Sequence, residues 1–187
     1  MEQHKHILKT HRLYLREFQL EDAHLLYDLD SDPEVMRFIT KGVPTPLDQI
    51  QDVILPRILS YYPRVPPEGC WAAHLVATNE FIGWFHLRAD RIDPHDMELG
   101  YRLKRIHWRK GLATEGSLAL LHKTFGDWGH ATVSGRTLVG NRASRRVLEK
   151  CGLLFVGEFF YGQDSCPGWP EDERRAVKYA ITRDKWS

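Results

Sequence analysis

The N-terminal part of the chain opens with a strand pattern that gives way to a helical one. Leu13 and Leu15 stand two positions apart between polar neighbours, and this alternation predicts a strand near 12–18. After Glu21 and Asp22, apolar residues recur every three or four positions, which predicts a first helix.

Two further helix starts follow, each marked by a proline. Asp32-Pro33 predicts a start because Asp caps the free N–H groups, and proline fits the first helical position. Thr45-Pro46 repeats the signal ahead of an apolar stripe over 47–61. Pro56 lies inside that third helix and is expected to kink or end it.

Strand patterns dominate the middle of the chain, and helices and strands then alternate to its end. The expected strands are Cys70–Ala77, Phe81–Arg88, Met97–Leu103, Ala131–Val139, Leu153–Tyr161 and Arg174–Thr182. The expected helices of this part are Thr114–Phe125 and Asn141–Cys151, the second ended by Gly152 in a left-handed cap. Gln163–Glu173 is polar and predicts a mobile surface loop. This order predicts an α+β fold with one central mixed sheet.

Composition narrows the class of protein. With 187 residues, the chain is expected to form one domain over 1–187. Lys plus Arg number 26 against 25 for Asp plus Glu, a net charge of +1 that argues against a dedicated nucleic-acid partner. The start lacks a signal-peptide pattern, and no run approaches the roughly 20 apolar residues of a membrane span. We therefore expect a cytoplasmic protein without a membrane partner.

One turn carries the clearest chemical signal. Trp108 to Thr114 precedes a helix, whose start offers free N–H groups and the positive end of the dipole to an anion. Gly111 permits close approach, and Arg109 and Lys110 add positive charge. The Walker and dinucleotide patterns are missing, which favours a diphosphate ligand other than ATP or NAD and disfavours a nucleotide-binding protein. The alternative is an ordinary connection in which Gly111 serves a tight turn.

Three segments together give this turn its context: Glu98–Leu103, Trp108–Glu115 and Asn141–Gly152. Together they resemble the GNAT N-acetyltransferase superfamily, and within it the RimJ/RimL-like branch of ribosomal-protein N-terminal acetyltransferases. The superfamily pattern Q/R-x-x-G-x-G/A is matched at Gly111 and Ala113, whereas Trp108 departs from its first position. The resemblance implies a mostly antiparallel mixed sheet flanked by helices, with a coenzyme cleft at a splay between two parallel strands.

The resemblance also implies acetyl-CoA as the cosubstrate and assigns residues to it. Backbone amides from Arg109 to Thr114 would hold the pyrophosphate, the backbone near Leu103 would pair with the pantetheine arm, and Asn141 and Ser144 match an N-x-x-S beside the coenzyme. The expected coenzyme-binding residues are Leu103, Arg109, Lys110, Gly111, Leu112, Ala113, Thr114, Asn141, Ser144 and Arg145. A plain N-cap for Asn141 and a solvated cation for Arg145 are the alternatives.

Two residues are expected to carry the chemistry. Transfer to an amine requires a proton acceptor for the nitrogen and a proton donor for the departing thiolate. Glu98 is the candidate base, acting through a water, and its alternative is a structural pair with Arg102. Ser144 is the candidate acid, and its alternative is a local hydrogen bond at the helix start. Tyr161 is a further tyrosine that the sequence does not place.

The cysteines, histidines and tryptophans are further candidates for functional roles. The three cysteines are an odd number at wide spacing, and Cys151 is expected to pack as a small hydrophobe. The histidines, including His4, His6 and His11, lack helical pairing, so no metal site is expected. Most tryptophans are core candidates, Trp108 among them, but Trp169 in the polar loop is expected to edge a substrate site.

The interpretation is a cytosolic N-acetyltransferase that uses acetyl-CoA by direct transfer in a ternary complex. Its acceptor is a primary amine, with a protein or peptide N-terminus favoured over an aminoglycoside or another small molecule. The helices over 22–62 and the Gln163–Glu173 loop are expected to line the acceptor cleft. The alternative is a noncatalytic acyl-CoA-binding sensor or scaffold. A homodimer is left open.

Overall fold

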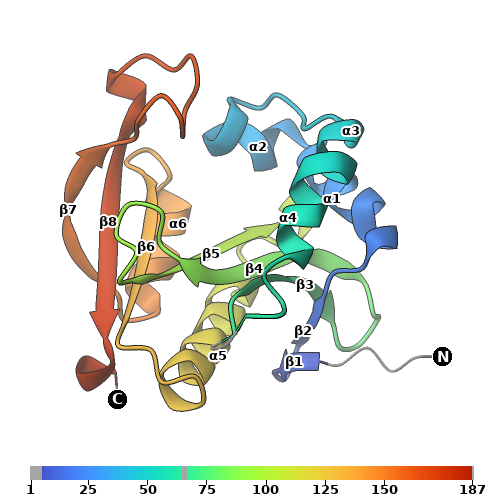
Figure 1. The fold of residues 1–187 in the computed structure, drawn as a ribbon, viewed down its shortest axis with the longest axis horizontal. Coiled ribbons are helices and arrows are strands. Elements are labelled where there is room, and N and C mark those ends of the chain that lie inside the picture. The colour runs from blue at the N-terminus through green and yellow to red at the C-terminus, as the bar shows by residue number, and fades with distance from the viewer. Residues whose placement is uncertain (1–5, 65–66, 187) are drawn as a thin grey trace.

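In the described residues, eight strands form one sheet in the order β1-β2-β3-β4-β5-β6-β8-β7 (Figure 1). The computed structural model describes residues 6–64 and 67–186, so His4 lies outside the described residues. The strands are β1 (His6–Lys9), β2 (Leu13–Glu17), β3 (Gly69–Leu75), β4 (Phe81–Ala89), β5 (Met97–Leu103), β6 (Thr132–Leu138), β7 (Leu154–Phe160) and β8 (Arg175–Thr182). β2 matches the strand expected near 12–18. The six strands from β3 to β8 match the six strands expected between Cys70 and Thr182.

The helices cover both faces of this sheet. They are α1 (Ala23–Asp30), α2 (Pro33–Thr40), α3 (Leu47–Gln49), α4 (Leu55–Leu59), α5 (Leu112–Gly126) and α6 (Arg142–Lys150). Asp32 caps α2 by accepting from the Glu34 N–H, with proline in the first turn as its sequence predicts. Gly152 takes a left-handed φ of 83° after α6, which confirms the predicted cap.

One pair of neighbouring strands is parallel and the others are antiparallel, so the predicted mixed sheet is confirmed. The parallel pair is β5 and β6, and its register contains only Met97 with Val133 and Glu98 with Ser134. After these two positions the strands separate. The splay that the family resemblance implies therefore lies between the second half of β5 and the second half of β6.

Two elements differ from the sequence-based expectation. β1 was not predicted, and it pairs with β2 at the edge of the sheet. The third helix is divided by a π-helical turn, η2 (Ile50–Ile54), in which the Leu55 N–H donates to the Ile50 carbonyl five residues earlier. Pro56 stands in the first turn of α4, where its missing N–H costs least, so the chain widens before the proline instead of kinking at it.

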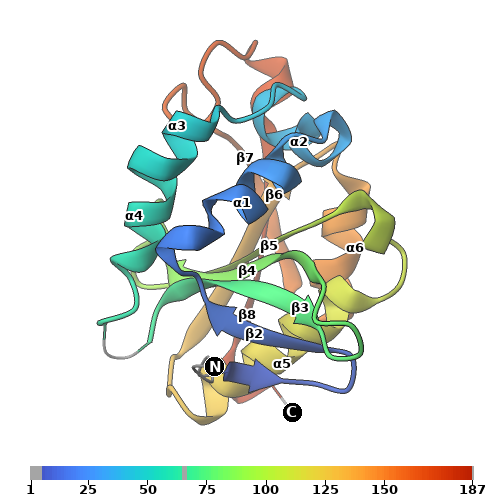
Figure 2. The same cartoon turned by 90° about the vertical axis from the view of Figure 1, so that its right-hand side faces the viewer.

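The helices divide the buried residues into separate clusters, each of which contains one cysteine. α5 and α6 pack on one face of the sheet over the largest cluster, which holds Cys151 (Figure 2). α1, α2 and α4 cover the other face over a second cluster, with Cys70. Cys166 and Trp169 form a third with Leu138 and Ala176 near the end of β6.

This third cluster corrects two expectations about the Gln163–Glu173 loop. Trp169 is buried, with Lys41 4.9 Å from its ring centre, so it belongs to a small core and does not edge a substrate site. Both Cys166 and Trp169 anchor the middle of the predicted mobile loop. Trp108 was expected in the core, but it is 41% exposed and is not a core residue.

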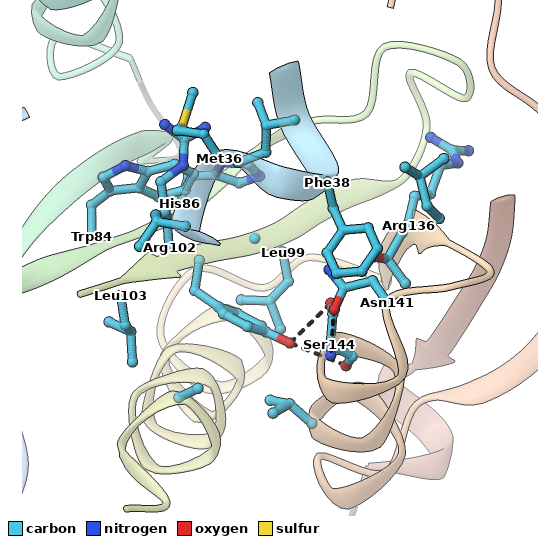
Figure 3. Close-up of a pocket in the computed structure, with 18 of the residues that line it drawn as sticks. Met36, Phe38, Trp84, His86, Leu99, Arg102, Leu103, Arg136, Asn141 and Ser144 are labelled. Carbon is cyan, nitrogen blue, oxygen red and sulfur yellow. Dashed lines mark hydrogen bonds between the residues drawn. The ribbon is translucent and has the colours of Figure 1, made fainter. Parts of the chain in front are cut away.

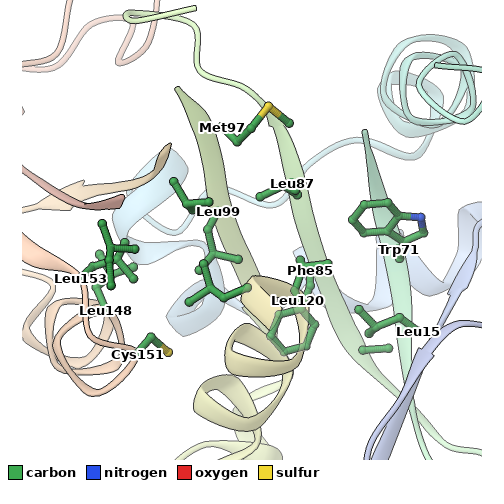
Figure 4. Packing of buried hydrophobic residues seen from close by; sticks show 14 of the residues in the cluster. Leu15, Trp71, Phe85, Leu87, Met97, Leu99, Leu120, Leu148, Cys151 and Leu153 are labelled. Atoms are coloured by element: carbon green, nitrogen blue, oxygen red, sulfur yellow. The ribbon is translucent and has the colours of Figure 1, made fainter. Parts of the chain in front are cut away.

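The largest cluster depends on a close approach of α5 to the sheet (Figure 4). Phe85 of β4 and Leu120 of α5 are both fully buried there. Gly116 of α5 lies directly on the Phe85 ring, and a Cβ at this position would overlap the ring atoms. The helix can approach the sheet this closely because position 116 has no side chain.

Gly116→Ala is expected to lower the free energy of unfolding by about 1–3 kcal/mol, since the added methyl group must displace Phe85 or the helix. Gly126→Ala is the matched control at the end of the same helix, where an added Cβ meets nothing within 4 Å. That control is expected to stabilise the protein by up to about 1 kcal/mol through helix propensity. Urea unfolding of the three proteins measures both effects, and equal stability of the two variants would contradict the packing argument.

Candidate active site

A cleft of about 1680 Å³ opens where β5 and β6 separate. Its walls come from α2, from the second halves of β5 and β6, and from the first turns of α5 and α6. Figure 3 shows Trp84, His86 and Arg102 together on one side of it, and Asn141 and Ser144 of α6 across the opening. The strand separation thus brings together residues that lie far apart in the sequence.

The free edge of β5 supplies backbone groups to this cleft. The Lys104 N–H donates to the Ile82 carbonyl of β4, and antiparallel strands alternate in the direction of their backbone groups. The backbone groups of Tyr101 and Leu103 consequently point away from β4 and toward the opening. The Leu103 carbonyl already accepts from the Trp108 indole Nε1 at 2.8 Å, so its expected role toward a ligand falls to its N–H.

The start of α5 faces the same cleft. Gly111 is the N-cap residue and adopts a left-handed φ of 79°, which favours glycine. The helix behind it has 15 residues, so its first N–H groups and positive dipole end are directed at the opening. Arg109, Gly111, Leu112, Ala113 and Thr114 line the cleft, whereas Lys110, which the sequence also assigned to the coenzyme, is not among its lining residues.

Arg12 holds this turn in place, although no pattern in the sequence indicates this role. Its guanidinium donates to the Lys110 carbonyl at 2.8 Å and to the Glu115 carboxylate at 2.5 Å. Glu115 also accepts from the Thr10 hydroxyl at 2.5 Å. Burial raises the pKa of Glu115, but these hydrogen bonds outweigh burial and lower the pKa overall. Arg12 thereby offsets a carboxylate charge in the first turn of α5 that would repel an anion.

The first turn of α6 presents a hydroxyl to the cleft from the opposite wall. Asn141 caps the helix by accepting from the Ser144 N–H at 3.2 Å. Asn141 is therefore an N-cap, which was the alternative to its expected role in coenzyme binding. The Tyr101 hydroxyl lies 3.1 Å from the Ser144 carbonyl and 3.2 Å from Ser144 Oγ. Because a carbonyl can only accept, the tyrosine proton goes to it, and in the contact between the two hydroxyls Ser144 is then the donor and the Tyr101 oxygen the acceptor. Burial raises the pKa of Tyr101, which keeps this donor protonated.

Arg145 has a structural task in the same helix. Its Nε donates to the Tyr179 hydroxyl at 3.2 Å, which raises the pKa of the guanidinium, and its Nη1 lies 3.4 Å from the Val139 carbonyl. These contacts attach α6 to β8. They favour a structural role over the coenzyme contact that the sequence suggested.

Three cross-strand pairs of β4 and β5 form the floor of the cleft, across from α6. They are Trp84 with Arg102, His86 with Gly100, and Arg88 with Glu98. Alternation along β5 places Glu98, Gly100 and Arg102 on this one face.

Glu98 is held by a residue that the sequence did not indicate. Its Oε2 accepts from Arg88 at 2.7 Å, and the His86 Nε2 lies 3.8 Å away. The structural partner considered for Glu98 was Arg102, and that pairing is wrong, because Arg102 forms its ion pair with Asp30 of α1. A gap of 72 positions separates Asp30 and Arg102, so local spacing could not reveal it.

The structure resolves which tyrosine stands beside Ser144. Tyr161 lines the far part of the cleft, where burial, and then the nearby charge of Glu98, raise the pKa of its hydroxyl. Tyr101 is the one in contact with Ser144. Tyr101 directly follows Gly100 on β5, and it was not among the site residues expected from the sequence, because only the fold brings it next to α6.

Two observations concern other kinds of site. Within residues 6–64 and 67–186, no three His, Cys, Asp or Glu side chains gather so that they could hold a metal ion. In the same part of the chain, no helix has the length and apolar character needed to cross a membrane.

Comparison with known proteins identifies the family to which this chain is similar. Residues 12–154 match the family described as the acetyltransferase (GNAT) domain. The FsC-acetyl coenzyme A-N(2)-transacetylase of Aspergillus fumigatus is 34% identical, over 96% of this chain and 77% of its own length. An uncharacterised N-acetyltransferase of Bacillus subtilis, YnaD, is 26% identical over 96% of this chain and 99% of its own.

Solved structures show the same fold at low sequence identity. RimL, a ribosomal L7/L12 α-N-protein acetyltransferase solved with coenzyme A, has a TM-score of 0.78 at 15% identity, covering 97% of this chain and 99% of its own. The aminoglycoside acetyltransferase AAC(6')-Ib, also with coenzyme A, has a TM-score of 0.72 at 20% identity, covering 92% and 96%.

Proposed function

Because the chain belongs to the acetyltransferase (GNAT) family and is therefore an acyltransferase that uses acetyl-CoA, we propose how its own cleft performs N-acetylation. The acetyl group passes directly from the coenzyme to a primary amine while both are bound. The coenzyme enters between β5 and β6, and the amine lies over the floor that β4 and β5 form.

One observation carries this proposal: the gap between β5 and β6 and the start of α5 belong to the same cleft. A coenzyme A molecule presents an amide-bearing arm and a pyrophosphate. The outward backbone groups of Tyr101 and Leu103 suit the arm, and the turn at Gly111 suits the pyrophosphate. The residues present thus fit acetyl-CoA at both of its polar parts.

The two expected catalytic residues stand on opposite sides of the gap. The Ser144 hydroxyl, whose resting acceptor is the Tyr101 oxygen, is proposed to donate its proton to the thiolate instead as the C–S bond breaks. The Glu98 carboxylate is proposed to balance the positive charge that the amine's proton brings to the cleft. A noncatalytic acyl-CoA sensor needs neither group, and the presence of both in the cleft favours the enzyme.

The acceptor is proposed to be an α-amino group, on a peptide N-terminus or on a small molecule built like a peptide. Two similar proteins support this choice by their descriptions, one as an N(2)-transacetylase and the other as an α-N-protein acetyltransferase. The aminoglycoside acetyltransferase among the similar structures keeps a sugar amine as the second candidate.

A panel of amines with acetyl-CoA tests the proposed function. We would measure free thiol release with four acceptors: an alanyl dipeptide, spermidine, kanamycin, and FsC, the compound in the name of the Aspergillus fumigatus transacetylase. Mass spectrometry would identify the acetylated nitrogen. Turnover with the dipeptide or FsC supports the proposal. Tight binding of acetyl-CoA without turnover on any amine would instead support the sensor.

Gly111→Asp is expected to abolish the rise in melting temperature that acetyl-CoA causes, because it brings bulk and negative charge to the start of α5. For the wild type, a ligand at 100 times its Kd stabilises the fold by about 2.7 kcal/mol. Gly152→Asp is the matched control, since Gly152 is also left-handed but follows α6 outside the cleft. Both variants should lose stability, and only Gly111→Asp should lose the response to acetyl-CoA in thermal unfolding.

Glu98→Gln is expected to lower kcat while acetyl-CoA binding is retained, because the cleft loses the negative charge that balances the amine's proton. Arg88→Gln is the comparison, because it breaks the same ion pair but leaves the carboxylate in place. If Glu98 serves only that ion pair, the two variants will lose stability alike and turn over alike. Steady-state kinetics with thermal unfolding of both variants separates these outcomes.

Ser144→Ala is expected to lower kcat on the order of 10² with little change in the acceptor KM, because a thiolate is a poor leaving group without its proton. Ala143→Ser serves as a control that places a hydroxyl one position away, at an exposed residue that also lines the cleft, while Ser144 stays in place. Unchanged kcat in Ser144→Ala would assign the acid to Tyr101 or to water.

A further inference from the structure

His86 takes up an unusual place on the floor of the cleft. It stands opposite Gly100 in the register of β4 and β5, and a Cβ on Gly100 would overlap its imidazole atoms, Nε2 among them. The ring therefore fills the place of the missing side chain. Gly100 comes two residues after Glu98, the last β5 residue paired with β6. His86 Nε2 consequently lies over β5 at the point where the gap begins.

The nitrogen at this point is buried and unused. His86 Nε2 has no hydrogen-bond partner among the described residues, and the Glu98 Oε2 is 3.8 Å away. A buried polar atom without a partner is rare and calls for an explanation. Trp84 stacks on the same ring at 5.4 Å between centroids and fixes its plane (Figure 3).

The charges around the ring keep it neutral. Arg88 on β4, Arg91 in the following loop, and Arg102 and Glu98 on β5 surround it. Two charged groups complete the set: Arg57 of α4 lines the same region, and Asp30 of α1 is paired with Arg102. Burial first, and then the three arginines of β4, β5 and the loop, hold the pKa of His86 well below its usual range. A neutral imidazole keeps a nitrogen able to accept a hydrogen bond and a proton.

We propose that His86 is a catalytic residue, which accepts the proton that the acceptor's nitrogen loses during acetyl transfer. The inference rests on the proposed function and deepens it. The amine nitrogen bonds to the thioester carbon, the C–S bond breaks, and the N–H proton passes to the imidazole. The sulfur takes the hydroxyl proton of Ser144, and both residues exchange protons with solvent before the next turnover.

This role assigns the neighbouring carboxylate a definite part. Arg88 already donates to the Glu98 Oε2 at 2.7 Å, and the same oxygen faces His86 Nε2. Glu98 is then the counter-charge of the imidazolium and acts through His86, where the sequence suggested a water. A weakly basic ring suffices, because the nitrogen is positively charged and acidic once it has attacked the carbonyl. The arginines then favour rapid return of the proton to solvent.

The test compares two histidines that each have a buried Nε2 without a partner among the described residues, with whichever panel amine the wild type acetylates. His86→Asn keeps a polar side chain that cannot take a proton, and its kcat is expected to fall by about 10²–10⁴ with an unchanged melting response to acetyl-CoA. His130 also has a buried Nε2 without a partner among the described residues, but it lies outside the cleft, so His130→Asn should keep its kcat.

Chemical rescue distinguishes proton transfer from packing. His86→Ala leaves a space above Gly100, and added imidazole is expected to restore kcat in proportion to the fraction of its neutral form. Full turnover of His86→Asn, or a loss in His86→Ala that imidazole does not relieve, would overturn the role while the proposed function stands. Absence of turnover by the wild type on every amine would overturn the proposed function and this inference with it.

Discussion

The separation of β5 from β6 is the constraint on which the rest of the molecule depends. The two strands share only two paired positions, and every group proposed to act on a ligand stands at or beyond that point. Leu148 of α6 packs so closely on Gly135 of β6 that a Cβ there would overlap it. This contact pulls α6 against β6 and sets its first turn at the gap, facing the start of α5.

Long-range ion pairs connect the surrounding layers to this gap. Arg12 ties the turn before α5 to the start of β2, and Arg102 ties β5 to the end of α1. Thr45 adds a hydrogen bond to Asp30 at 3.0 Å, so the segment before α3 joins the same network. The Arg102 and Thr45 contacts with Asp30 are buried or half-buried, whereas Arg12 is an exposed residue on the rim of the cleft. Loss of one partner of Asp30 would leave a polar group in the interior without its hydrogen bond.

Local patterns in the sequence predicted the parts that depend on neighbours in the chain. Alternation located β2, Gly152 takes the predicted left-handed conformation after α6, and Asn141 caps α6 as its alternative role predicts. The side chains that complete the site come from cross-strand register and tertiary packing instead. Nothing near Arg12 in the sequence indicates a partner about a hundred positions away.

The register of the β4–β5 hairpin shows the same limit at closer range. The pairing of His86 with Gly100 depends on how many residues the intervening loop takes up, and alternation alone leaves that number open. Trp169 was misjudged for a related reason, because its polar neighbours describe the loop but not the small cluster beneath it. The composition of a segment indicates whether the segment as a whole is polar. The burial of one of its side chains depends on which residues the fold packs against that side chain.

The distribution of the thiols has a use that is independent of catalysis. The three clusters of buried residues hold one cysteine each, Cys151, Cys70 and Cys166. Burial raises the pKa of Cys70 to about 12 and that of Cys151 to about 11, and it raises the pKa of Cys166 as well, so none reacts readily in the closed state. The labelling rate of each thiol by an alkylating reagent therefore reports how often its own cluster opens. The native chain contains three internal probes of local unfolding, one for each part of its interior.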